Sequence, residues 1–319
     1  MNEVQMAENP AETVEDVLRN ELAQGDAVIA TARPILHHLL AHDDHSMFND
    51  EVVARVRGMM HDIAFQLLFA TAEAAGLRDR TQLLEEQRDE LAGALFADTD
   101  FLAHAHALTL EAQLTERLQR RSGVDGVLSS LLQEQTASSD PGTAGLAMMV
   151  IASQARFMQR FRRMELPLAE LPGDLFHRAL LALADHAGDH AEAAAKAANA
   201  LRANYVEGEG RLGLTGRLVA SLGSRAMKAL AIDHSGVAIF TTALAMASRQ
   251  DRDLTILSLG DRQFARLALA LCAAGLTQPE VEAQFLYLHP DIALPEGFEA
   301  LTADRAAALL AGSSRAFAG

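Results

Sequence analysis

Two long stretches of the chain contain no proline, the strongest breaker of helices. The eight prolines leave residues 35–140 and residues 173–278 uninterrupted, and each stretch is long enough for several helices of ordinary length. Alanine and leucine are abundant, tryptophan is absent, and aromatic residues make up 5% of the sequence. A core of such small aliphatic side chains lets helices approach one another closely. The sequence therefore predicts an all-α protein.

The clearest predicted helix spans residues 49–75. Its apolar residues recur at helical spacing on one face: Val52, Val56, Met59, Met60, Ile63 and Leu67. Gly76 is a natural stop for this helix, because glycine readily adopts the left-handed conformation that ends helices. Two separate helices are expected before it, Pro10–Gln24 and Asp26–His42, with Pro34 either kinking or restarting the second.

A segment with two prolines and a glycine, LPLAELPG at 166–173, predicts a boundary within the chain. We expect a disordered N-terminus over 1–9, an N-terminal helical bundle over 10–165, this linker, and an irregular C-terminal half over 174–319. Tracts of alternating Leu and Ala echo one another in that half without a fixed period. They favour helical hairpins stacked as in a solenoid, although a compact bundle of similar helices would explain them equally well.

The charge balance excludes several kinds of partner. The chain has 43 acidic and 27 basic residues, a formal net charge of −16, and so it repels nucleic-acid phosphates and anionic membranes. We therefore expect binding to neither. One local cluster of arginines stands at the end of a predicted helix: Arg156, Arg160, Arg162 and Arg163. Because cations in a last helical turn favour the helix dipole, a solvated helix end explains this cluster without a phosphate site.

The remaining composition predicts a cytoplasmic protein. The single cysteine, Cys272, excludes intramolecular disulfides and cysteine-based zinc clusters, and it lies in an apolar run that favours a buried, inert thiol. The acidic N-terminus has neither a basic leader nor an apolar central region. No segment has the ~18 continuous apolar residues that a membrane-spanning helix needs.

Two stretches resemble a known family: HSMFNDEVVARVRGMMHDIAFQLL (45–68) and DRDLTILSLGDRQFARLALALCAAGLTQPEVEAQFL (251–286). They are similar to uncharacterised helical-repeat proteins of alphaproteobacteria, a family of unknown function. The resemblance covers about a fifth of the chain and includes no catalytic signature. It implies an all-helical repeat protein and modestly favours an interaction module, and it assigns no functional residue.

Histidines cluster near residue 40 and suggest a metal site. On a helix, His38 and His42 stand four residues apart and would face one ligand. A carboxylate such as Asp44 could complete the set. The cluster lacks the glutamate of the HExxH motif, and polar histidines near a helix end explain it without a metal. A metal ion is the only cofactor that the sequence suggests.

His61 suggests a second chemistry, because MMHDI on a long amphipathic helix is similar to the phospho-accepting helix of histidine phosphotransfer domains. Arg57 lies one turn earlier and could offset the charge of a phosphate, and Asp62 is adjacent. The alternative is an ordinary histidine on the flank of a helix.

Motifs of nucleophilic catalysis are absent from the sequence. It contains no GxSxG and no plausible Cys/His arrangement. The glycine-rich run EGEGRLGLTG, 207–216, has the spacing of neither common phosphate-binding loop. An active site assembled from distant helices would leave no local motif. The sequence leaves that case open and favours a non-enzymatic protein.

The leading hypothesis is therefore a non-enzymatic helical scaffold or regulatory adaptor that binds another protein in a groove between helices. The expected interface is the predicted helix that contains LALALCAAG, 267–275, together with the neighbouring segment TQPEVEAQFLYLHP, 277–290. The apolar area of this surface comes from Leu276, Phe285, Leu286 and Leu288. Surrounding acidic residues favour a basic partner helix, and a second copy of the chain could also cover this area. The alternative is that all four side chains belong to the core.

Overall fold

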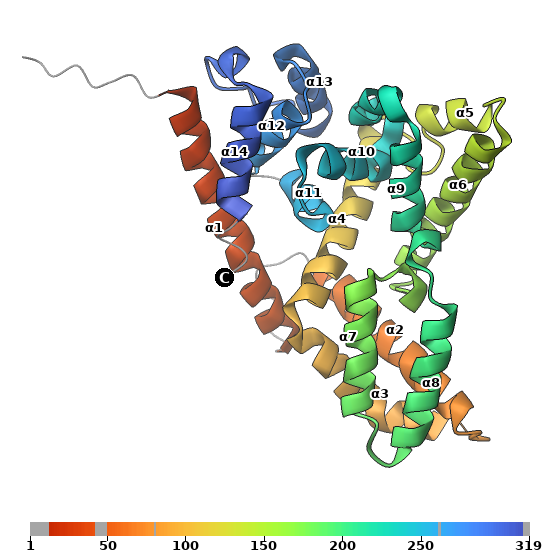
Figure 1. The fold of residues 1–319 in the computed structure, drawn as a ribbon. Coiled ribbons are helices and arrows are strands. Elements are labelled where there is room, and N and C mark those ends of the chain that lie inside the picture. Colours follow the sequence, from red (N-terminus) through yellow and green to blue (C-terminus); the bar gives the residue numbers. More distant parts are fainter. Residues whose placement is uncertain (1–12, 42–49, 80, 261–262, 315–319) are drawn as a thin grey trace, which may run out of the picture.

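The computed structural model describes residues 13–41, 50–79, 81–260 and 263–314, and every regular element within them is a helix (Figure 1). The all-α prediction is confirmed. The α-helices are α1 (Val14–Ala41), α2 (Asp50–Ala74), α3 (Thr81–Ala97), α4 (Thr99–Ser122), α5 (Ser130–Thr136), α6 (Pro141–Arg162), α7 (Gly173–Asp185), α8 (Ala191–Asn204), α9 (Arg211–Ser221), α10 (Ile232–Ser248), α11 (Arg252–Ser258), α12 (Phe264–Ala273), α13 (Gln278–Leu288) and α14 (Ala303–Ser314). Short 3-10 helices lie at Leu168–Glu170, Gly188–His190, Glu207–Glu209, Gly223–Leu230 and Phe298–Ala300.

Several helix ends are encoded locally. The Asp98 carboxylate accepts the backbone N–H of Asp100 at 2.9 Å before α4, and the Asp140 carboxylate accepts that of Thr143 at 2.8 Å before α6. Such caps satisfy amide groups that have no partner within the helix. Gly76, the predicted stop after α2, has a φ of +68°, which glycine adopts without strain. The predicted stop at Gly76 is confirmed.

The first helix differs from the prediction. A break is expected between Gln24 and Asp26, but α1 continues through Gly25 and past Pro34. The Gln263 side chain donates from Nε2 to the Gly25 carbonyl oxygen at 2.8 Å. A Cβ atom at Gly25 would lie only 2.7 Å from Oε1 of Gln263. The glycine therefore permits close packing of α1 against the residue before α12, and it does not end the helix.

Two hydrophobic cores organise the molecule. The first core combines residues of α1, the second half of α4, α5, α6 and α9–α14. The second core combines residues of α2, α3, the first half of α4, α7 and α8. Figure 1 shows α2, α3, α7 and α8 gathered at one end of the molecule, with α4 running from that end into the other. Helix α4 is therefore shared by both cores.

The segment 166–173 is packed against the second core. Leu166, Leu168 and Leu171 are all buried there. Each core contains helices from before and after this segment, because the chain passes back and forth between the two ends. The hydrophobic cores consequently do not divide the chain at 166–173. The predicted disordered stretch 1–9 lies outside the described residues.

A buried ion cluster stands at the middle of α4. The Glu111 side chain is fully buried and accepts hydrogen bonds from Arg211 at 2.5 and 3.2 Å. Nη1 of Arg252 lies 3.0 Å from the second carboxylate oxygen. Burial alone would raise the pKa of Glu111, but the two guanidinium charges outweigh it and hold that pKa at about 2. Glu111 is therefore ionised wherever the protein is folded near neutral pH.

Further contacts attach this cluster to other helices. Arg211 at the start of α9 also donates to Oε1 of Gln154 at 3.2 Å and lies 3.8 Å from the ring centre of Phe157, both on α6. Nε of Arg252 donates to Thr242 of α10 at 3.0 Å. Through one carboxylate, α4 is joined to α6, α9, α10 and α11.

No single described helix is long and apolar enough to span a bilayer. The 3-10 helix Gly223–Leu230 and α10 pass the length and composition test only together, and they meet at a bend of 109°. Most of α10 is buried in the first core, which accounts for its apolar sequence.

We predict that Glu111→Gln lowers the free energy of unfolding by about 3–5 kcal/mol, because it leaves two buried guanidinium groups without a counter-charge. Glu116→Gln, on the same helix but partly exposed, should change it by less than about 0.5 kcal/mol. Urea unfolding followed by circular dichroism measures both values. Equal losses in the two variants would show that the cluster does not stabilise the fold.

Candidate functional site

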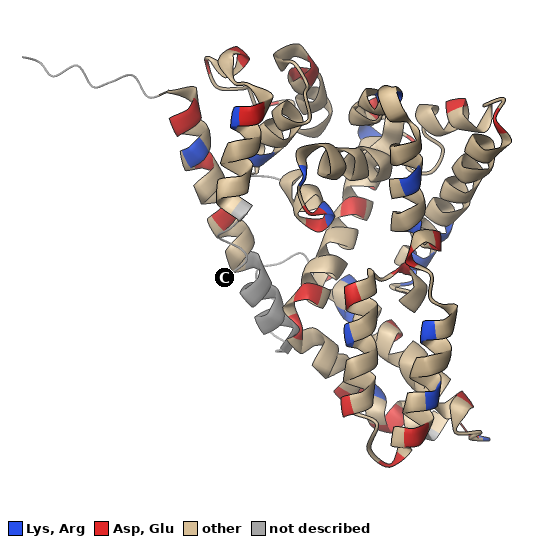
Figure 2. Ribbon diagram, in the orientation of Figure 1, with Lys and Arg blue, Asp and Glu red and all other residues tan. Residues whose placement is uncertain are grey.

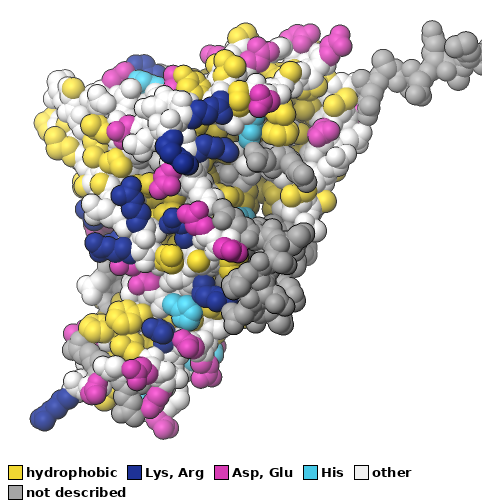
Figure 3. All heavy atoms as spheres, turned by 180° about the vertical axis from the view of Figure 1, so that it is seen from behind, with side chains coloured by type: hydrophobic (Ala, Val, Ile, Leu, Met, Phe, Trp, Pro, Cys, Tyr) yellow, Lys and Arg dark blue, Asp and Glu magenta, His cyan; other side chains and the backbone are white. Residues whose placement is uncertain are grey.

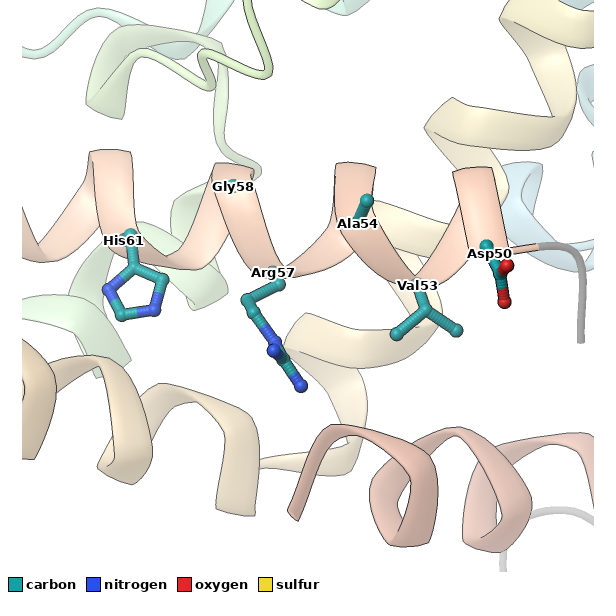
Figure 4. A pocket seen from close by; sticks show the side chains of 6 residues that line it. All are labelled: Asp50, Val53, Ala54, Arg57, Gly58 and His61. Carbon is teal, nitrogen blue, oxygen red and sulfur yellow. The ribbon is translucent and has the colours of Figure 1, made fainter. Parts of the chain in front are cut away.

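A cavity of about 480 Å³ lies along one face of α2 (Figure 4). Its lining residues are Asp50, Val53, Ala54, Arg57, Gly58 and His61. They recur at intervals of three and four residues, so they share one side of the helix. Figure 4 shows the side chains of His61 and Arg57 extending to the same side of α2. The structure therefore brings together the two residues that the phosphotransfer hypothesis requires.

Residues of α3 surround the His61 ring. Its Nδ1 atom lies 3.7 Å from Oδ1 of Asp89, and the ring meets Phe96 edge to face with centroids 5.8 Å apart. Burial lowers the pKa of His61, although the Asp89 charge acts in the opposite direction. The imidazole is therefore neutral near neutral pH, as a nucleophile must be. Sequence spacing could not identify Asp89, because it lies on α3 and approaches His61 only where α3 packs against α2.

Asp62 does not belong to this cavity. Its carboxylate accepts the backbone N–H of Leu166 at 2.8 Å and the Nε2 group of Gln66 at 2.7 Å. The Gln66 side chain also bonds the backbone of Leu166 and Leu168. Partial burial raises the pKa of Asp62. The residue beside His61 in sequence therefore fixes the segment 166–168 onto α2.

The predicted metal site cannot be placed in space. His42 and Asp44 lie outside the described residues, and so does the side chain of His38. Within the part of the chain that is described, no three His, Cys, Asp or Glu side chains are arranged to hold a metal ion. The metal site stays a prediction.

A further histidine, His104 of α4, is buried, with Nδ1 2.7 Å from Oδ2 of Asp253 on α11. It is covered because α11 packs over this side of α4. This contact is a second polar link between the two helices.

The expected interface near α13 is mostly core. Leu276, Phe285 and Leu288 are buried in the first core, whereas Leu286 is 65% exposed. The packing of α12 and α13 within one subunit covers the first three side chains. This surface therefore offers a partner one of the four predicted apolar residues.

Arginines form a second candidate site, which we call the arginine surface: Arg55 of α2, Arg117 and Arg120 of α4, and Arg160 and Arg162 of α6. Figure 3 shows Lys and Arg side chains gathered over the middle of this side of the molecule. Figure 2 shows Asp and Glu spread over the whole molecule, its middle included. The four arginines of the cluster at 156–163 all lie in the last two turns of α6 or just after it.

Contacts of Arg55 connect the parts of this surface. Its guanidinium group lies 4.3 Å from the ring centre of Phe161, and Nη1 donates to the Phe161 carbonyl oxygen at 3.2 Å. It also pairs with Glu51 at 2.6 Å. Glu51 in turn lines a groove with Arg117 and Arg120. The ends of α4 and α6 are thereby joined across the start of α2.

The other arginines of this surface have no acidic partner. Arg117, Arg120, Arg160 and Arg162 form no ion pair with any carboxylate of the described residues. The nearest pair involves Arg163 and Glu165, whose charged atoms are 4.0 Å apart. In a chain with a net charge of −16, these four arginines place positive charge on the ends of two helices.

The groove beside them separates α4 from α11 and has a volume of about 420 Å³. Its lining residues are Glu51, Leu110, Gln113, Leu114, Glu116, Arg117, Arg120, Ile256, Leu259 and Gly260. Its floor is aliphatic and its rim is charged. Sequence reasoning missed this site, because the floor joins two helices that are far apart in the chain.

Comparisons with protein-family models, curated proteins and solved structures found no match to this chain. The resemblance of residues 45–68 and 251–286 to helical-repeat proteins therefore stays a prediction. No relative supplies a functional residue, and the two sites are the basis for assigning a function.

We predict that His61 titrates below its ordinary pKa of about 6.5, because burial penalises the charged imidazolium. Asp89→Asn should lower the midpoint further, since it removes the carboxylate that favours the charged form. Nuclear magnetic resonance of the ring protons measures both midpoints. A His61 midpoint above 6.5, or an unchanged midpoint in Asp89→Asn, would contradict the described surroundings of the ring.

Proposed function

We propose that this protein is a non-enzymatic helical adaptor that binds another protein through the arginine surface. The observation that carries the proposal is a set of arginines that form no ion pair with a carboxylate of the described residues: Arg117, Arg120, Arg160 and Arg162. The chain has 43 carboxylates to pair with them. An exposed ion pair contributes at most about 1 kcal/mol, so leaving these cations unpaired costs the free protein little. They stay available to the carboxylates of a partner.

A protein fits this surface better than a polyphosphate or a membrane. Carboxylates stand among the arginines, including Glu51, Glu116 and Glu165. The closely spaced negative charges of a phosphate backbone or an anionic bilayer would be repelled by these carboxylates. A protein can place its acidic side chains opposite the arginines and apolar or basic ones elsewhere. The net charge of −16 opposes the other two partners in the same way.

A second candidate, histidine phosphotransfer, is favoured by the cavity on α2. His61 and Arg57 line it together, and Asp89 approaches Nδ1 of the ring. A carboxylate near Nδ1 would orient the imidazole and leave Nε2 to accept the phosphoryl group.

Incubation with phosphorylated response regulators tests this second candidate. Wild type and the control His177→Gln, an exposed histidine of α7, should become labelled, and His61→Gln should not. Labelling of all three proteins, or of none by a representative panel of regulators, would eliminate phosphotransfer at His61.

Charge reversal tests the adaptor proposal. Immobilised wild type should capture a protein from a nuclease-treated lysate of its source cells. The variant Arg117→Glu/Arg120→Glu should capture at least about fivefold less of that protein, because its glutamates repel the carboxylates of the partner. Arg202→Glu/Arg225→Glu places the same charge on α8 and on the 223–230 segment and should capture as wild type does. Equal capture by all three proteins, or capture that occurs only from a lysate without nuclease, would contradict the proposal.

A further inference from the structure

We infer that the groove between α4 and α11 binds an acidic amphipathic helix of a protein partner, with its apolar residues in the groove and its carboxylates on the arginines around it. This inference rests on the proposed adaptor function and names the kind of partner. It is argued from the floor of the groove, the charge of its rim, and the extent of the surface around it.

The floor of the groove is apolar and held in place by the first core. Leu114, Ile256 and Leu259 are buried, and Leu110 is only partly covered. The 420 Å³ of open space above them is enough for one or two large aliphatic side chains. Apolar residues spaced three or four apart on a partner helix would reach such a floor together.

The rim of the groove has an excess of unpaired positive charge. Arg117 and Arg120 stand on it without acidic partners. Of the two carboxylates on the rim, Glu51 is already paired with Arg55 at 2.6 Å. Glu116 remains, and it is outnumbered by two arginines. Charge complementarity therefore selects a partner segment that is acidic beside its apolar residues.

The extent of the surface indicates a segment longer than a small anion. Arg55 lies against Phe161 and connects the groove with the end of α6, where Arg160 and Arg162 lie. A single carboxylate or phosphate in the groove would leave those two cations unused. A helix of several turns presents carboxylates along its length and can reach both ends.

A second copy of this chain fits less well. Its acidic side chains would have to meet the arginine surface of the first copy, while its own arginine surface stayed open. That arrangement is heterologous and grows into open assemblies unless a ring closes. A separate acidic partner occupies the surface in a complex of one partner and one chain, so the assembly does not grow further.

A designed peptide tests the inference directly. The probe is a fluorescein-labelled helix of about 18 residues with Leu at positions i, i+3, i+4 and i+7 and Glu on the other faces. Its control has the same composition with the Leu positions scrambled, so that the charge is kept and the apolar face is lost. Fluorescence anisotropy at physiological salt measures binding of each peptide to wild type and to variants that keep the circular dichroism spectrum of wild type.

We expect the amphipathic peptide to bind wild type at least about tenfold more tightly than the scrambled one. Arg117→Glu/Arg120→Glu should weaken it about tenfold or more, since each reversal replaces an attraction by a repulsion. Leu110→Gln should weaken the amphipathic peptide and leave the scrambled one unchanged. Arg202→Glu/Arg225→Glu should bind as wild type does.

Other outcomes overturn the inference in distinguishable ways. Equal binding of both peptides, or no binding of either, removes the groove as a helix site, and the lysate capture then decides the adaptor function separately. Tighter binding of duplex DNA or of phosphatidylserine vesicles overturns both proposals. Sedimentation that shows a dimer dissociated by the peptide would assign the groove to a second copy.

Discussion

The buried carboxylate of Glu111 is the constraint on which the rest of the structure depends. It stands at the middle of α4, the helix that both hydrophobic cores share, and it binds the side chains of Arg211 and Arg252. A buried charge is tolerated only when it is paired and hydrogen-bonded. Ion pairing at this point therefore requires that α4, α9 and α11 lie together. It also fixes the α4–α11 groove, because the same two helices form the groove floor one turn further along α4.

The arginines of this protein differ in whether they have a carboxylate partner. Inside the protein, Arg211 and Arg252 form ion pairs with Glu111. Arg266 pairs with Asp26 where α1 meets α12. The arginines at the ends of α4 and α6 stay on the outside without acidic partners. Unpaired cations on the surface of an acidic chain can form ion pairs with the carboxylates of another molecule. This arrangement is the basis of the proposed association with another protein.

Local signals predicted what depends on local contacts. The apolar stripe of the 49–75 helix and the Gly76 stop both act over a few residues. What failed depends on contacts across the chain. Gly25 reads as a break until Gln263, 238 residues away, is seen packed on it. Glu111 and Arg211 are 100 residues apart, and no periodicity shows that they meet. The α4–α11 groove has the same origin, whereas His61 and Arg57 were found because one helix carries both.

Hydrogen exchange with mass spectrometry, with and without the acidic amphipathic helix, tests most directly where this protein binds its partner. The account predicts slower exchange at the second half of α4, at α11 and at the end of α6, because these elements would contact the bound helix. Exchange at α8, which contributes no residue to the groove lining, should stay unchanged. Protection centred on α13 around Leu286, with none on α4, would contradict the account and return the interface to the site that the sequence alone suggested.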